Sequence, residues 1–371
     1  MGRLGIIGTF ILVAGCAAAS PGPTAVPSAS VTAGATATAT PGTTPAPTPV
    51  AVRPGESWIV FQWSDNDRGL PLIRPDGRDV HWILSDLPGP AYHPDWSPTG
   101  ERIAFELGRG DVTEIWIADA DGTDPTKAVA CVEDPCKWVD RPAWSPDGSR
   151  LAYVRFDEID GTGYASIEVL DIDSGMRQVV AKPPPPIDGY SEYIFPRWSP
   201  DGSQIVFEVT HEPMPPTGPV LGSSLAVARS DGSDVDAPRN LTDPSLFAAY
   251  PDWSPDGERI VFNTYELSYF QDTTKASNLY TIRPDGTGLT QVTRFGNGDT
   301  RATQPSWTPD GRQIIFTWIG CEPSCGAAQW GQRRIGLIDV DGSNLTVLDG
   351  QPATHPRIRP FRDDPSRAST P

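Results

Sequence analysis

The sequence is poor in basic residues and in histidine. Its 371 residues include 29 lysines and arginines against 47 aspartates and glutamates, which gives a formal net charge of −18. Because nucleic acid attracts positively charged surfaces, this balance argues against nucleic acid as a partner. Only four histidines occur, and there is no G-x-S-x-G, H-E-x-x-H or glycine-rich phosphate loop. We therefore predict no catalytic residues, no cofactor and no metal site.

The sequence also lacks a long apolar run near its start. Leu4 to Val13 form a short apolar core behind a single charge, Arg3. Such a core is too short to span a bilayer and is typical of a signal peptide, which we predict over residues 1–15. The segment Val13-Ala14-Gly15-Cys16 resembles a bacterial lipobox, which predicts cleavage before Cys16 and lipidation of its thiol. The alternative is a conventional signal with a chance cysteine.

The segment after Cys16 has no charged residue. Residues 17–50 contain only Ala, Ser, Pro, Gly, Thr and Val. Such a composition cannot bury a core, so residues 16–50 are predicted to be a lipidated, disordered spacer before a folded domain. With the signal, this predicts an exported lipoprotein held on the outer side of the cytoplasmic membrane, at the cell surface or in the periplasm.

Cysteine is scarce, and apart from Cys16 it occurs as two close pairs. Cys131 and Cys136 lie in CVEDPC, and Cys321 and Cys325 lie in CEPSC. In an exported chain such pairs predict two local disulfides. Zinc binding is the alternative.

One short motif is abundant. It reads PDWSPTG at 94–100, PAWSPDG at 142–148, PRWSPDG at 196–202, PDWSPDG at 251–257 and PSWTPDG at 305–311. Its tryptophans are spaced 48, 54, 55 and 54 residues apart, and are Trp96, Trp144, Trp198, Trp253 and Trp307. A fixed period in this range is the signature of a repeat architecture.

Each repeat predicts four short strands. The motif supplies a proline–glycine turn, followed by an apolar run such as Ile205-Val206-Phe207. A second turn of the form D-x-D-G follows later, as at Asp119 to Gly122, after a strand such as Ile115-Trp116-Ile117. Aspartate in such turns is ordinary turn chemistry, and the spacing does not match a calcium loop. Four antiparallel strands per repeat make one propeller blade.

A sixth repeat is incomplete. Trp58-Ile59-Val60-Phe61 matches the apolar run, but its turn motif is missing, and His355-Pro356 near the end matches His93-Pro94. We predict that the last segment completes the first blade and closes the ring, which removes exposed sheet edges. The expected fold is an all-β, six-bladed propeller of four-stranded blades over residues 51–362, with a disordered tail at 363–371.

These repeats resemble the TolB-type, WD40-like β-propeller repeat over most of the chain. The resemblance implies an envelope scaffold that binds peptide or sugar, or a propeller attached to a peptidase, although no peptidase domain follows here. It is specific for the fold and much less so for the function.

Strand order places the two kinds of turn on one face of the propeller, the turn face. The longer connections then share the opposite face, the loop face, where binding is expected. Its aromatic residues include Tyr269, Trp318 and Trp330, which either contact a partner or pack the loops onto the propeller. The motif tryptophans are predicted to pack between blades.

The residue before each motif proline enters the innermost strand from the loop face. These residues are predicted to form a ring at the mouth of the central channel, which either binds a ligand or seals the channel: His93, Arg141, Phe195, Tyr250, Gln304 and His355. An open pocket there would favour ligand binding, whereas a plugged channel would favour a protein-contact scaffold. We call these six residues the mouth ring.

The sequence thus favours a surface-anchored, monomeric, non-catalytic propeller that binds a protein or glycan of the cell envelope. The alternative is an enzyme that acts on glycans or lactones at the channel mouth. No residue pattern identifies the partner.

Overall fold

The computed structural model describes residues 52, 56–63, 69–110, 112–132, 135–159, 162–184, 189–213, 222–265, 277–296, 300–320, 332–349 and 352–360. Over these residues the chain is all-β, with no α-helix and one short 3-10 helix, η1 (Pro244–Leu246). Cys16 and the predicted signal and spacer segments lie outside the described residues.

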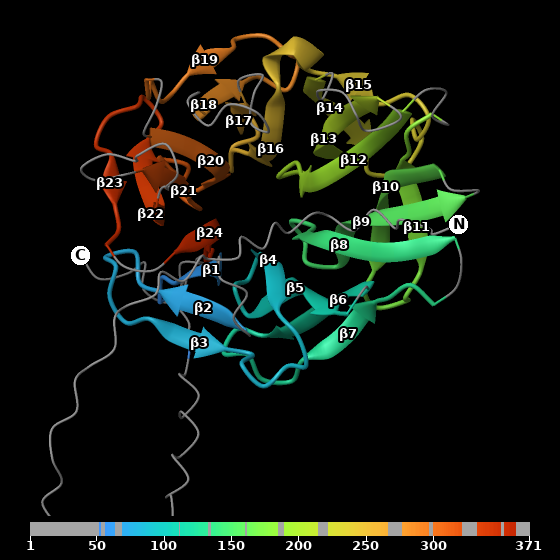
Figure 1. The fold of residues 1–371 in the computed structure, drawn as a ribbon, viewed down its shortest axis with the longest axis horizontal. Helices are drawn as coiled ribbons and strands as arrows, with labels where there is room; N and C mark the ends of the chain where they lie inside the picture. Colours follow the sequence, from blue (N-terminus) through green and yellow to red (C-terminus); the bar gives the residue numbers. More distant parts are fainter. Residues whose placement is uncertain are drawn as a thin grey trace, which may run out of the picture. The chain divides into compact units, whose positions relative to one another are not determined.

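The strands form a propeller around a central axis (Figure 1). Four sheets have four strands each. The first contains β24 (Ala353–Ile358), β1 (Ile59–Trp63), β2 (Leu70–Ile73) and β3 (His81–Ile83). The second contains β4 (Ala91–Trp96), β5 (Arg102–Arg109), β6 (Val112–Asp119) and β7 (Thr126–Val129). The other two contain β16 (Ala248–Trp253), β17 (Ile260–Tyr265), β18 (Ser277–Ile282) and β19 (Thr290–Gln291), and β20 (Thr300–Trp307), β21 (Gln313–Gly320), β22 (Gln332–Asp339) and β23 (Thr346–Val347).

The remaining strands form one eight-stranded sheet. They are β8 (Cys136–Trp144), β9 (Arg150–Ile159), β10 (Thr162–Asp171), β11 (Arg177–Ala181), β12 (Gly189–Trp198), β13 (Gln204–Pro213), β14 (Gly222–Arg229) and β15 (Arg239–Asn240). The expectation of six separate four-stranded blades is therefore wrong. The strands β8–β15 are joined because β10 and β12 make a parallel pair at Ala165 and Glu192.

The C-terminal strand closes the ring. Strand β24 pairs antiparallel with β1, with Ile358 opposite Ile59 and Ala353 opposite Trp63. Figure 1 shows β24 beside β1, although these two strands come from opposite ends of the propeller sequence. The predicted match of His355-Pro356 to the first repeat thus corresponds to a real strand pairing.

The turn motif folds as its sequence predicts. In the turn at 145–148, Gly148 N–H donates to Ser145 O at 2.9 Å, and Gly148 has a φ of 74°. Asp147 Oδ1 accepts from Ser145 Oγ at 2.6 Å and from Ser149 N–H at 3.0 Å. These hydrogen bonds, that of Ser145 above all, lower the pKa of Asp147. Aspartate therefore supplies turn chemistry here.

The two kinds of turn lie on one face, as strand order predicts. Ala120 N–H, in a D-x-D-G turn, donates to Glu101 O of the neighbouring motif turn at 2.8 Å. Ile172 N–H donates to Ser149 O in the same way at 3.0 Å. The strand connections therefore divide between the turn face and the loop face.

The hydrophobic core lies between neighbouring blades. One cluster joins Trp58 and Leu72 of the first sheet to Trp96 and Phe105 of the second. The motif tryptophan also forms a polar link to the preceding repeat: Trp96 Nε1 donates to Arg357 O at 3.2 Å, and Trp198 Nε1 to Ala143 O at 3.1 Å. Trp307 Nε1 makes the same link to Asp252 O at 3.2 Å, whereas the Nε1 atoms of Trp144 and Trp253 are buried without a hydrogen-bond partner.

Candidate functional site

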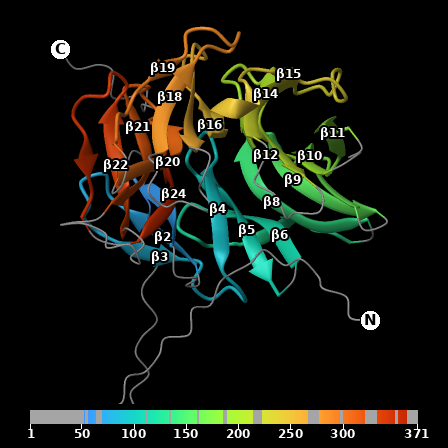
Figure 2. The ribbon, with the colours of Figure 1, turned by 45° about the horizontal axis from the view of Figure 1, so that its top comes forward.

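The mouth ring is held by a strained backbone that recurs around the channel. Its members all have a positive φ, and they are His93 at 46°, Arg141 at 52°, Phe195 at 54°, Tyr250 at 53°, Gln304 at 56° and His355 at 51°. Each lies at a β-bulge on an innermost strand, β4, β8, β12, β16, β20 or β24. Figures 1 and 2 show these strands nearest the axis. A bulge re-aims a side chain, and the left-handed conformation costs about 1–2 kcal/mol per non-glycine residue, so the surrounding structure must enforce it.

Side chains of neighbouring strands accept hydrogen bonds from the ring backbone. Tyr250 N–H donates to Glu208 Oε2 at 3.2 Å, and Gln304 N–H donates to Asn263 Oδ1 at 3.0 Å. His355 N–H donates to Gln304 Oε1 at 3.2 Å. These acceptors satisfy donors that each bulge frees from strand pairing, which stabilises the ring geometry.

The ring side chains pack against one another. The His93 and His355 rings are 4.5 Å apart between centroids, and the Phe195 and Tyr250 rings are 4.1 Å apart. The Arg141 guanidinium lies 4.5 Å from the centre of the Phe195 ring. The structure therefore brings the predicted residues together at one place. Ligand binding by them remains a prediction.

Glu208, next to the ring, and His355, a member of the ring, have shifted pKa values. Burial raises the pKa of Glu208 to about 7, and the Tyr250 N–H opposes this shift. Burial also lowers the pKa of His355 well below its usual value, and the electrostatic influence of His93 and the charge of Arg357 lower it further. His355 is therefore neutral at neutral pH. The Nδ1 atom of His93 lies 2.8 Å from Glu106 Oε2.

A layer of alternating charges lies one step deeper in the channel. Arg197 lies 3.8 Å from Asp95 and 3.7 Å from Asp252, and Arg357 lies at the same two distances from these aspartates. Asp252 also accepts from Trp307 N–H at 2.9 Å. Burial, followed by the charge of Arg197, lowers the pKa of Arg357 to about 10. We call Asp95, Arg197, Asp252 and Arg357 the charged layer.

The mouth ring and the charged layer together plug the channel. The cavity between them has a volume of about 10 Å³, which is the space of one water molecule. The mouth-ring side chains are all half-buried, so they still present surface at the channel mouth. The small cavity is what the sealing alternative predicts, and ligand binding by the ring stays a prediction.

The charged layer was not anticipated from the sequence, although its signal was present. Each member follows the proline of its repeat: Asp95, Arg197 and Asp252 occupy the x position of P-x-W, and Arg357 stands in Pro356-Arg357-Ile358. These four residues alternate in sign along the chain. A larger groove of about 750 Å³ lies on the turn face and is lined by motif-turn residues that include Asp256, Arg259 and Trp307. No sequence feature singled out this groove.

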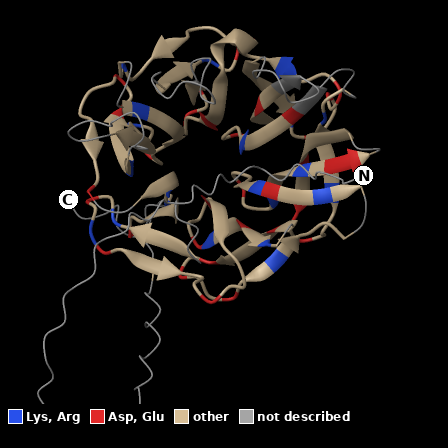
Figure 3. Cartoon of the chain, in the orientation of Figure 1, with Lys and Arg blue, Asp and Glu red and all other residues tan. Residues whose placement is uncertain are grey.

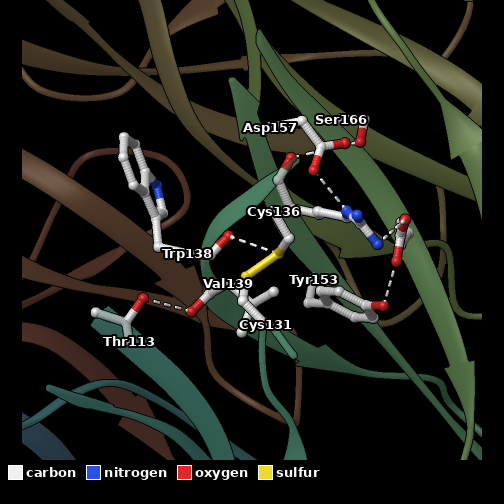
Figure 4. The surroundings of a disulfide bond; sticks show 10 residues. Thr113, Cys131, Cys136, Trp138, Val139, Tyr153, Asp157 and Ser166 are labelled. Carbon is white, nitrogen blue, oxygen red and sulfur yellow. Dashed lines mark hydrogen bonds and ion pairs between the residues drawn. A yellow bond between two sulfur atoms is a disulfide. The ribbon is translucent and has the colours of Figure 1, made fainter. Parts of the chain in front are cut away.

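The Cys131–Cys136 disulfide is present, with Cα atoms 5.4 Å apart, which confirms that pair. Figure 4 shows it beside Trp138, at the start of β8. The Trp138 ring stacks on Phe156 with centroids 3.7 Å apart. The bond therefore joins the connection after β7 to Cys136, the first residue of β8, which pairs with Asp157 of β9. The pair Cys321 and Cys325 lies outside the described residues.

The predicted loop-face aromatics fall largely outside the described residues, as Tyr269 and Trp330 do. Trp318 lies in β21, is 8% exposed and packs in the core between the β16–β19 and β20–β23 sheets. Arg334 lies over its ring at 5.7 Å. This position favours packing over partner contact for Trp318.

Charges of both signs are interspersed around the propeller (Figure 3). Among the described residues, no three His, Cys, Asp or Glu side chains converge as a metal site would require. Within the same part of the chain, no helix is long and apolar enough to cross a membrane.

No protein-family model matches the chain. A 56-residue segment is 50% identical to the Tol-Pal system protein TolB of Bordetella pertussis, and it covers 15% of this chain and 12% of that protein. A longer segment of 180 residues is 28% identical to an uncharacterised protein of Agrobacterium fabrum and covers 47% of this chain and 52% of that protein. The chain therefore matches less than two thirds of the length of either relative.

Solved structures share the fold at low sequence identity. TolB from Acinetobacter baumannii superposes with a TM-score of 0.56 at 16% identity, over 82% of this chain and 66% of that one. Hydrazine synthase of Kuenenia stuttgartiensis superposes with a TM-score of 0.60 at 12% identity, over 83% of this chain and 47% of that one. Propellers with different functions thus share this architecture.

Proposed function

The chain is a propeller of the TolB type, and on that premise we propose that it is a non-catalytic module that binds a protein partner in the cell envelope. The observation that carries this proposal is the plugged channel, whose cavity of about 10 Å³ has no room for a sugar ring or a lactone. The side chains that plug it are half-buried, with two histidines, two aromatic residues and one arginine among them. Aromatic and arginine side chains are enriched in the centres of protein interfaces.

We place the partner on the loop face, centred on the mouth ring. Long strands support this choice, because β9, β10, β12 and β13 each contain ten residues. The Cys131–Cys136 disulfide lies at the beginning of β8, which pairs with β9, one of these long strands. Rigid strands beside a preformed ring reduce the conformational entropy that the protein loses when a partner binds.

We also infer that the eight-stranded sheet takes part in partner binding through two of the six innermost strands that carry the mouth ring, β8 and β12. Both β8 and β12 carry the bulge and the mouth-ring residue of an innermost strand. The parallel pairing that joins the halves involves a single residue pair, Ala165 and Glu192.

Anchoring by a lipid on Cys16 completes the proposal. A signal peptide at 1–15 and a spacer at 16–50 would hold the propeller (51–362) away from the membrane, with a short tail at 363–371. One acyl-carrying residue beside a charge-free spacer is typical of exported lipoproteins. The protein would be a monomer that meets its partner at the outer side of the cytoplasmic membrane. A glycan remains the second type of partner, bound by loop-face aromatics.

Capture of partners from an envelope fraction tests the binding proposal. Tyr250→Ala on the mouth ring should reduce capture, because it removes a half-buried ring from the proposed interface centre. Asp121→Asn, in a turn-face turn whose Oδ1 accepts from Thr123 N–H at 3.0 Å, is the matched control and should leave capture intact. Loss of capture with Asp121→Asn and not with Tyr250→Ala would refute the loop-face assignment.

A further inference from the structure

The cavity at the channel mouth is basic in a protein that is otherwise acidic. Five basic side chains line it and no aspartate or glutamate does: His93, Arg141, Arg197, His355 and Arg357. The chain as a whole has a formal charge of −18. The aspartates that pair with these arginines, such as Asp95 and Asp140, do not line the cavity. The mouth is therefore a local exception to the charge of the molecule.

Several nitrogen atoms around this cavity are buried without a hydrogen-bond partner. They are Arg141 Nε, Arg357 Nε and both ring nitrogens of His355. Arg357 Nε lies 3.8 Å from Asp95 Oδ1, an ion-pair distance that is beyond hydrogen-bond reach. Buried polar atoms without hydrogen-bond partners are costly and are rare in folded proteins. A neutral His355 offers one N–H donor, and each arginine Nε offers another. Two strands, β8 and β24, thus supply residues with unused nitrogen atoms to the lining of one small cavity.

We propose that this cavity is a carboxylate subsite, which receives the side chain of an aspartate or glutamate of the protein partner. The inference rests on the function proposed above, since the partner supplies the group. A carboxylate only accepts hydrogen bonds, and its two oxygens match guanidinium donors. One oxygen fits the space of one water molecule, while the rest of the ligand extends towards the loop face.

The electrostatics of His355 support the same assignment. Burial, the electrostatic influence of His93 and the charges of Arg357, Arg141 and Arg197 hold the pKa of His355 well below its usual value. The arginines among these neighbours favour an anion at this point. By linkage, an anion bound here must raise the pKa of His355, and protonation of His355 must strengthen binding of the anion.

Histidine NMR of the full chain tests the proposal, because only four histidines contribute imidazole signals. Signals are assigned with histidine-to-glutamine variants, and the protein is titrated with sodium propionate or with propionamide at constant ionic strength. Propionate should shift the His93 and His355 signals saturably, with half-saturation on the order of 1 mM, and should raise the pKa of His355. Propionamide should do neither. The signal of His81, which packs on Trp58 away from the mouth, should stay constant.

Two arginine variants distinguish propionate binding at the subsite from a general effect of ions on the histidine signals. Arg141→Gln should weaken propionate binding roughly tenfold or more, because it removes a charged donor. Arg102→Gln is the matched control, since Arg102 lies over the Trp144 ring outside the mouth, and it should bind as the wild type does. If Arg141→Gln unfolds, Arg141→Lys tests the same point by retaining the charge without the Nε donor. Equal shifts with propionamide or sodium chloride, equal effects of the two arginine variants, or no shift would each overturn the proposal.

A peptide pair tests the source of the carboxylate. Acetyl-Gly-Glu-Gly-amide should compete with propionate, whereas acetyl-Gly-Gln-Gly-amide should not. Binding of propionate without binding of the glutamate peptide would overturn the assignment to a partner's side chain. The two proposals fail separately. Propionate binding with no loop-face capture refutes the function, whereas capture that survives without propionate binding refutes the subsite alone.

Discussion

Arg359 replaces the turn motif that the first repeat lacks, and its removal should destabilise ring closure. In complete repeats, Arg102 and Arg150 lie over the motif tryptophan of the next repeat, at 4.7 Å from Trp144 and 4.6 Å from Trp198. Arg359 follows β24 and lies 5.8 Å from the Trp96 ring. It is 4% exposed, and its Nε donates to Gly100 O at 2.7 Å and its Nη1 to Glu56 O at 3.3 Å.

The magnitude follows from these two hydrogen bonds. Each hydrogen bond from a charged group contributes about 1.5–3 kcal/mol, and part of this is offset by the desolvation of the guanidinium. Burial lowers the pKa of Arg359, which is the direction expected for a desolvated guanidinium. We therefore expect Arg359→Met to lower the free energy of unfolding by about 2–4 kcal/mol. Methionine keeps much of the volume, so a cavity adds little.

Urea unfolding followed by tryptophan fluorescence measures the effect. Arg102→Met is the matched control, because this half-exposed side chain stacks on Trp144 without the two buried carbonyl partners. It should cost less than about 1 kcal/mol. Similar small losses for both variants would refute the view that Arg359 substitutes for the missing motif.

Three further outcomes are expected. Deletion of residues 355–371 should lower the melting temperature much more than Arg359→Met does, because it removes most of β24 and opens the edge of β1; an unchanged melting curve would exclude closure by this segment. Cys16→Ala should move the protein from the membrane fraction to the soluble fraction or block its processing, and unchanged fractionation would refute lipidation. Glu208 has a pKa raised to about 7 in the folded state, so the folded state binds more protons than the unfolded state and stability falls as pH rises from about 4.5 to 7. Glu208→Gln, which keeps an acceptor for Tyr250 N–H, should abolish this fall and gain up to about 3 kcal/mol above pH 7, and parallel stability–pH curves for variant and wild type would contradict it.

The turn chemistry of this chain was predictable because it is local. Pro146, Asp147 and Gly148 determine the backbone of a turn without reference to distant residues, and Asp147 makes the expected hydrogen bonds to Ser145 and Ser149. The near-constant spacing of the motif tryptophans, from Trp96 to Trp307, then predicted a propeller. A single repeat cannot bury its apolar sheet faces by itself, so the repeats must pack against one another.

The eight-stranded sheet could not be predicted in the same way. It depends on a parallel pairing of Ala165 with Glu192, which arises only when β10 and β12 are brought side by side. The repeat pattern is the same in the strands β8–β15 as elsewhere, so it gave no sign of this junction.

The position of the mouth ring followed from the sequence, whereas its chemistry followed from the tertiary structure. A residue belongs to the mouth ring when it precedes the proline of its repeat. His93 and His355 could therefore be assigned to one ring, although they are 262 positions apart in the sequence. The chemistry depends on side chains that come from different repeats. The rings of His93 and His355 lie 4.5 Å apart, Arg197 and Arg357 line the small cavity in the channel, and nitrogen atoms of residues around this cavity lack partners. The sequence by itself thus determined the repeat, its turns and the ring positions, because these are properties of one repeat. Only the tertiary structure decided the charge and closure of the channel mouth, because these arise where different repeats converge on the axis.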